Sequence, residues 1–105
     1  MLSFQFALKI IQLVKVLREA KEYVFADQIL RSVTSIGANV AEASAGQSKK
    51  DSISKMAIAS REARYWLRLL DQGNLVKIDL SDHLDEINQI IKILTKIVKT
   101  SQLKT

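Results

Sequence analysis

Five basic side chains are the residues of this sequence whose types and spacing best suit a chemical task. Lys49 and Lys50 are expected in the first turn of a helix, directly after the small-residue loop SAGQS, where free backbone amides and the helix dipole favour an anion. Arg61, Arg64 and Arg68 follow at spacings of three and four residues, which places them on one face of that helix. A guanidinium can bind phosphate or carboxylate oxygens through two parallel hydrogen bonds. The pattern therefore predicts a ridge that contacts the backbone of a nucleic acid without reading its bases.

Other interpretations of these residues stay open. The arginines could instead pair with acids such as Glu62, Asp71 or those of the last helix across a subunit boundary, because rows of charge are usually solvated or paired. Tyr65 and Trp66 lie among the arginines and could stack on bases, although aromatic residues at helical spacing more often belong to a core or an interface.

The sequence contains little that could support catalysis. It has no cysteine, and its one histidine, His83, is preceded three positions earlier by Leu80, so the Glu-x-x-His element of di-iron bundles is missing. A lone histidine beside Asp82 near a helix start is interpreted as a surface residue. The sequence has no glycine-rich phosphate loop, Ser-His-Asp set or metal-ligand cluster. We therefore expect a protein that is not an enzyme and that has no cofactor and no metal.

Length and composition define the kind of fold that must position the basic residues. The 105 residues suit a single domain over 1–105, and the absence of proline with 48% apolar residues favours long uninterrupted helices. The net charge of +5 is unevenly distributed, since residues 48–68 contain six basic and two acidic side chains whereas residues 69–91 contain one and five. No apolar run approaches the roughly 18 residues that cross a bilayer. We expect no membrane partner and a cytoplasmic location.

Hydrophobic periodicity predicts four helices, over residues 4–22, 24–45, 49–72 and 81–101. Their lengths and short connections predict an all-α, antiparallel up-down-up-down four-helix bundle. Gly46 is expected as a left-handed cap after the second helix, Ser48 and Asp51 as a capping box before the third, and Gly73 as the end of the third. The residues expected in the core recur at spacings of mostly three and four: Phe6, Ile10, Leu13 and Leu17; Ile29, Val33, Ile36 and Val40; Ile53, Met56, Ser60, Ala63, Leu67 and Leu70; Leu84, Ile87, Ile91, Leu94 and Val98.

The first and third helices carry more apolar surface than one bundle core can cover. Exposed patches of that extent usually mark an interface, so we expect a homo-oligomer. The alternative is a monomer with one large, irregular core. The residues assigned to the oligomer interface are Ala7, Ile11 and Val14 on the first helix and Ile58, Tyr65 and Leu69 on the third.

A polar row accompanies the core seam of the second helix. Gly37 within this helix costs about 1 kcal/mol relative to alanine, so we expect a close contact near Gly37, Ala38 and Ala41 to compensate. The row could be a hydrogen-bonded seam for helix packing or for an interface, or a solvated flank whose hydroxyls bond their own helix. It consists of Arg31, Ser32, Ser35, Asn39 and Glu42.

Two segments, ADQILRSVTSIGANVAEASAG and SKKDSISKMAIASREARYWLRLL, resemble the 23S rRNA intervening-sequence protein family, bacterial four-helix bundle proteins. The resemblance implies a small antiparallel bundle that assembles into a ring of five copies, a homopentamer. The family also includes relatives that resemble the accessory variability protein of diversity-generating retroelements, a protein associated with nucleic-acid binding. Many members carry Glu-Gly after the Asn motif, whereas here Ala43 follows Glu42 and the glycine comes at Gly46. The resemblance supplies no catalytic residues, and the biochemical role of the family is unsettled. The similarity covers about Phe6 to Leu94, and its signature RS-x-x-SI-x-x-N-x-AE falls on Arg31, Ser32, Ser35, Ile36, Asn39, Ala41 and Glu42.

The resemblance implies a ring-shaped accessory protein, and the basic residues predict that it binds RNA or DNA through Lys49, Lys50, Arg61, Arg64 and Arg68. The alternative is a structural scaffold whose ring binds another protein, such as a reverse transcriptase, and whose charges only maintain solubility. Charge reversal at the three arginines distinguishes the two, because only the first predicts loss of RNA or DNA binding from an intact assembly.

Overall fold

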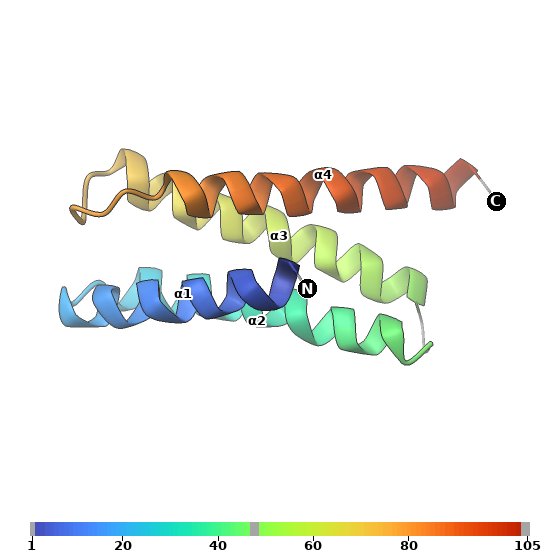
Figure 1. Cartoon of the computed structure of the whole chain (residues 1–105), viewed down its shortest axis with the longest axis horizontal. Coiled ribbons are helices and arrows are strands. Elements are labelled where there is room, and N and C mark those ends of the chain that lie inside the picture. The colour runs from blue at the N-terminus through green and yellow to red at the C-terminus, as the bar shows by residue number, and fades with distance from the viewer. Residues whose placement is uncertain (1, 47–48, 104–105) are drawn as a thin grey trace.

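The computed structural model describes residues 2–46 and 49–103, and within them the side chains of residues 4–46 and 49–100. The helices are α1 (Leu2–Glu19), α2 (Tyr23–Ser44), α3 (Lys49–Gln72) and α4 (Ser81–Leu103), and no strand occurs in the described ranges. The ribbon reverses direction at each connection between them (Figure 1). The chain is therefore an all-α four-helix bundle. The predicted capping box depends on Ser48, which lies outside the described residues.

Helices that follow each other in the chain pack against each other. The contact between α2 and α3 is the most extensive, α1 packs on α2 and α4 packs on α3, and the contact between α1 and α4 is small. The molecule measures 46 × 23 × 21 Å. With 18 residues α1 is the shortest helix, and its N-terminal end lies near the middle of the long dimension (Figure 1). One end of the bundle is therefore formed mainly by the other three helices.

The core follows the predicted spacing of three and four. Of the residues predicted for it, Val40, Ile53, Leu84 and Val98 are half-buried and the rest are buried, which confirms the seams. Burying one large aliphatic or aromatic side chain contributes about 1.5–3 kcal/mol, so these seams account for much of the stability of the bundle. Further buried apolar residues beyond the predicted set are Val14, Ala26, Ala59, Leu80 and Ile90.

The turn between α1 and α2 begins earlier than the sequence pattern indicates, since α1 ends at Glu19 and the prediction extended it to residue 22. Lys21 adopts a left-handed φ of 64°. The Glu22 amide donates to the Leu17 carbonyl at 2.8 Å and the Lys21 amide to the Arg18 carbonyl at 3.0 Å, the hydrogen-bond pattern of a Schellman motif. Glycine usually occupies this left-handed position, so a lysine there gave no sequence signal.

The ends of α2 and α3 differ in which residue turns the chain. Gly46 follows α2 with a φ of 82°, as predicted. After α3 the Gly73 amide still donates to the Leu69 carbonyl at 2.9 Å, and Asn74 takes the left-handed φ of 54°. Gly73 is required for a different reason, because a Cβ on it would lie 2.8 Å from the Leu69 carbonyl oxygen.

The start of α4 is fixed by Asp79. Its Oδ1 accepts hydrogen bonds from the Ser81 hydroxyl at 2.6 Å and from the Ser81 amide at 3.0 Å. These bonds lower the pKa of Asp79.

Among the described helices none combines the length and apolarity that crossing a membrane requires.

Candidate nucleic-acid interface

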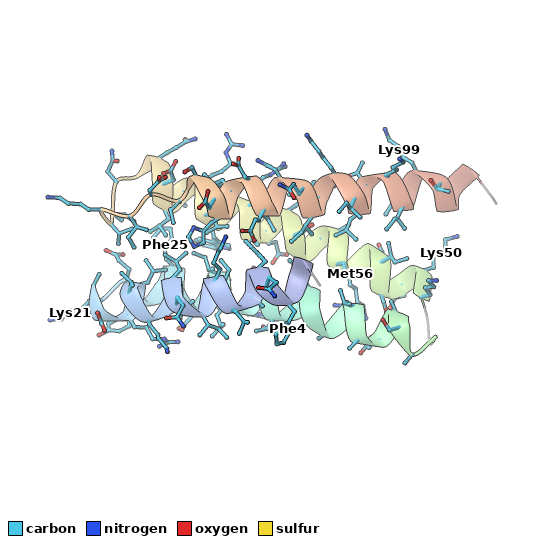
Figure 2. The ribbon with its side chains drawn as sticks, viewed as in Figure 1. Phe4, Lys21, Phe25, Lys50, Met56 and Lys99 are labelled. Carbon is cyan, nitrogen blue, oxygen red and sulfur yellow. The ribbon has the colours of Figure 1, made fainter. Side chains whose placement is uncertain are left out.

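Four of the five predicted basic residues lie together on the outer face of α3. A helix turns about 100° per residue, so Lys50, Arg61, Arg64 and Arg68 fall within an arc of about 60°, which we call the basic ridge. Three of these side chains are exposed and Arg64 is half-buried. Lys50 lies near one end of the molecule (Figure 2). Arg68 follows it by 18 residues in the same helix, which corresponds to about 27 Å along the helix axis. Lys49 is also exposed but lies about 100° around the helix from Lys50, outside the ridge.

Ion pairs in the described residues involve other cations. Lys9 pairs with Glu86, Arg18 Nη2 lies 2.7 Å from Asp27 Oδ1, and Lys55 Nζ lies 3.1 Å from Asp51 Oδ2. Within residues 4–46 and 49–100, no carboxylate lies within 4.0 Å of the charged nitrogens of Lys49 or of the basic ridge. Within one copy of the chain the described arginines of the ridge therefore have no acidic partner, and pairs across a subunit boundary stay a prediction.

Arg64 has a neutral partner instead. Its Nη1 donates to Asn88 Oδ1 on α4 at 3.3 Å, which orients the guanidinium along the α3–α4 boundary. A guanidinium has five N–H donors, so this one long hydrogen bond leaves most of them for a ligand.

A surface hollow of about 300 Å³ lies at the C-terminal half of α3, and we call it the Tyr65 hollow. Tyr65 is 58% exposed there. Its ring meets Trp66 edge-on with ring centroids 5.3 Å apart, and Trp66 in turn meets Phe25 of α2 edge-on at 5.7 Å. Phe25 packs against the core, so this chain of aromatic contacts anchors Tyr65 to the bundle. The residues that line the hollow are Arg64, Tyr65, Arg68, Leu69 and Gln72.

A second hollow of about 260 Å³ lies between α2 and α3, and we call it the Ser32 hollow. It brings three members of the predicted polar row together with Ile58 of the predicted apolar interface. Two basic side chains and one acidic side chain also line it, so its charge is mixed. The lining residues are Arg31, Ser32, Ser35, Lys55, Ile58, Ala59 and Glu62.

The polar row itself is divided by the packing of α2 on α3. Ser32 and Asn39 are buried, Ser35 is half-buried, and Arg31 and Glu42 are exposed. The Ser32 hydroxyl donates to the Gln28 carbonyl at 2.9 Å, and Asn39 Nδ2 donates to the Ser35 carbonyl at 2.8 Å. The side-chain hydrogen bonds found in the described part of this row thus stay within α2, as the second alternative predicts, but Ser32 and Asn39 are buried and do not form a solvated flank.

The predicted apolar interface is only partly on the surface. Val14 is 5% exposed and belongs to the core, so its assignment to an interface is wrong: α1 buries a wider arc than the main seam indicated. Ala7 is half-buried, whereas Ile11, Ile58, Tyr65 and Leu69 are exposed. Further apolar residues are exposed that the predicted interface does not include: Phe4, Leu8, Ile93 and Ile97. Phe4 and Leu8 precede Ile11 at spacings of four and three residues, a signal in the sequence that could have indicated them.

Gly37 lies in the interior of α2, and no close contact with another described helix explains it. Apart from its chain neighbours and the nearby backbone of its own helix, a Cβ added to Gly37 would meet no heavy atom within 4 Å. The expected compensating contact within the bundle is therefore absent from the described residues.

His83 is half-buried at the start of α4 and not the surface residue that the sequence indicated. Its Nδ1 is buried without a hydrogen-bond partner among the described residues. Burial lowers the pKa of His83, and the nearby positive charge of Lys9 lowers it further. In the described part of the chain, no three His, Cys, Asp or Glu side chains come together as metal ligands would.

The fold and the outer face of α3 define a helical bundle protein with a basic ridge. The model of a family described as 23S rRNA-intervening sequence protein matches residues 1–96. A crystal structure of a protein with unknown function from the S23 ribosomal protein family of Bacteroides thetaiotaomicron VPI-5482 is 38% identical, with a TM-score of 0.81, over 93% of this chain and 95% of that chain. A comparison with curated proteins finds no match. The chain belongs to the 23S rRNA-intervening sequence protein family, which confirms the resemblance seen in its sequence.

Proposed function

We propose that this protein is a non-enzymatic, cytoplasmic homo-oligomer that binds the phosphate backbone of RNA or DNA through the basic ridge of α3. The observation that carries the proposal is the absence of any carboxylate within 4.0 Å of the ridge in the described residues, although three other cations of the same chain each have an acidic partner. Lys49, beside the start of the ridge, would add to the positive potential. The family description refers to 23S rRNA, so RNA is the first nucleic acid to test.

The ridge brings like charges close together. Arg64 lies three residues after Arg61 and four before Arg68, the spacings at which like charges on a helix destabilise it by about 0.2–0.5 kcal/mol per pair. A row of phosphates would remove this repulsion and would release counterions on binding. The affinity would then depend on salt and not on base sequence.

Assembly of several copies explains the apolar surface that the bundle leaves exposed. Phe4, Leu8 and Ile11 recur at four and three residues on α1, and Ile58 is 59% exposed beside the Ser32 hollow. Contact between copies would cover these side chains. We propose an up-down-up-down bundle repeated in a ring, pentameric as the family resemblance implies, so that one ridge per copy faces the same ligand and strengthens binding through multivalency.

The decisive experiment is a filter-binding titration at several salt concentrations with two charge-reversed variants. One carries Arg61→Glu, Arg64→Glu and Arg68→Glu. The control carries Lys15→Glu, Lys77→Glu and Lys96→Glu, three exposed lysines outside α3, and has the same net charge. The wild type is expected to lose affinity linearly in log salt, with a slope of about −0.7 per contacted phosphate on a single strand and about −0.9 on a duplex.

The ridge variant is expected to lose binding, whereas the control keeps most of it, and both should sediment as the wild type does. A wild-type affinity that does not change with salt, or an equal loss in both variants, contradicts backbone binding by the ridge. Assembly without any nucleic-acid binding would favour the scaffold alternative. Sedimentation of the wild type as an 11.8 kDa particle at micromolar concentration contradicts the assembly.

A further inference from the structure

We propose that the ligand of the basic ridge is single-stranded nucleic acid, and that Tyr65 is the platform on which one unpaired base stacks. This inference rests on the proposed function and adds to it the class of nucleic acid and the position of a base. It starts from the Tyr65 hollow, where an exposed aromatic ring and two guanidinium groups line one space of about 300 Å³.

The positions of the three side chains fit a nucleotide unit. Arg64 directly precedes Tyr65 and Arg68 follows it by three residues, so cations lie on one side of the ring along the ridge. Neither guanidinium has a carboxylate within 4.0 Å in the described residues. Phosphates on both arginines would place the intervening sugar and base next to the ring, while Leu69 adds an apolar wall to the hollow.

Tyr65 is held in place before any ligand arrives. Its edge-on contact with Trp66, and that of Trp66 with Phe25, restrict the side chain although 58% of its surface is exposed. A restrained ring loses little rotamer entropy when a base stacks on it. Phosphate contacts need no such exposed, anchored aromatic group, so the ring indicates a ligand with accessible base faces.

Single-stranded chains have such faces and duplexes do not. In a duplex both faces of each base are covered by its neighbours, and a tyrosine on a straight helix cannot enter the stack without unpairing it. In a single strand every base has a face for an aromatic side chain, which makes stacking tolerant of sequence. The inference therefore assigns Tyr65 to the ligand, and leaves Ile58 and α1 to contacts between copies.

The test compares a single-stranded and a duplex oligonucleotide of equal length at one salt concentration, with the full chain. Tyr65→Ala is expected to weaken single-strand binding by about 5- to 150-fold, the loss of one stacked base, and to leave duplex binding within about twofold. Tyr65→Phe keeps the ring and should stay within about threefold of the wild type. Tyr23→Ala removes the other tyrosine, which is also exposed, and should change neither affinity.

A spectroscopic readout is independent of affinity. Trp66 is the only tryptophan and touches Tyr65, so its fluorescence should change when a single strand binds the wild type and should stay constant in Tyr65→Ala at saturating ligand. The salt slope of the variant should match that of the wild type, because the phosphate contacts remain.

The outcomes separate this inference from the proposed function. Ridge-dependent, salt-dependent binding that Tyr65→Ala leaves unchanged, or equal wild-type affinity for both oligonucleotides, overturns the stacking site and leaves backbone binding intact. Dissociation of the assembly by Tyr65→Ala assigns the ring to a subunit interface and also overturns the inference. Absence of nucleic-acid binding in the wild type removes both proposals.

Discussion

Replacing Gly37 by alanine should stabilise the folded chain by about 1 kcal/mol. The residue lies inside the 22-residue helix α2, and the only glycine with a positive φ in the described residues is Gly46, so alanine fits the backbone of Gly37. A Cβ there would meet no heavy atom within 4 Å apart from its chain neighbours and the nearby backbone of its own helix, so the gain in helix propensity is not offset by a clash with another element. The equilibrium constant for folding should increase about fivefold, since about 1.4 kcal/mol corresponds to a factor of ten.

The assay is equilibrium unfolding in urea, followed by helical circular dichroism. With an m-value of about 2 kcal/mol/M for a domain of this size, Gly37→Ala should raise the midpoint by about 0.5 M without changing m. Gly73→Ala is the matched control, because its Cβ would lie 2.8 Å from the Leu69 carbonyl oxygen, and it should cost about 1–3 kcal/mol. An unchanged or lower midpoint for Gly37→Ala refutes the reasoning, since it would mean that atoms from another molecule occupy the space beside Gly37.

Two further predictions concern buried polar groups. Ser52 is buried and its Oγ has no hydrogen-bond partner in the described residues, so Ser52→Ala should raise the free energy of unfolding by about 1 kcal/mol in the same urea titration. Ser60→Ala is the control, because the Ser60 hydroxyl is hydrogen-bonded. If Ser60→Ala raises the free energy of unfolding by as much as Ser52→Ala or more, the reasoning is contradicted. Burial and the positive charge of Lys9 lower the pKa of His83 in the folded chain, so the unfolded chain binds the proton more readily. The free energy of unfolding should therefore fall as the pH drops below about 6.5 towards the pKa of His83 in the folded chain. His83→Gln should remove this part of the pH dependence of unfolding, and an unchanged difference in stability between pH 8 and pH 5 would show that other groups cause it.

The fold could be predicted because the apolar residues repeat with the helical period. The seam through Ile29, Val33 and Ile36 occurs on one face of α2, and all three side chains are buried. Such a seam needs only the regular geometry of a helix. The same regularity predicted that the arginines of α3 share a face, since residues three and four apart are neighbours on any helix.

Features that depend on tertiary contacts could not be predicted in the same way. Periodicity alone does not give the width of the arc that neighbouring helices cover, which is why it places Val14 at an oligomer interface although this side chain is buried in the core. The left-handed Lys21 is held by the Schellman hydrogen bonds of its turn and not by its own preference. The Ser32 hollow is lined by residues of both α2 and α3, so it depends on how closely these helices approach, which sequence spacing does not specify.

The proposed assembly and the proposed ligand binding both use the exposed part of α3. This helix packs on α2 on one side and on α4 on the other, so only its outer arc remains free. That arc contains the basic ridge and, beside it, the stripe of Ile58, Tyr65 and Leu69. Ile58 and Tyr65 are seven residues apart, about 10 Å along the helix axis. A neighbouring copy seated at Ile58 and the Ser32 hollow can therefore end before the Tyr65 hollow. The arginines at the C-terminal end of the ridge would then stay accessible in every copy of the proposed ring.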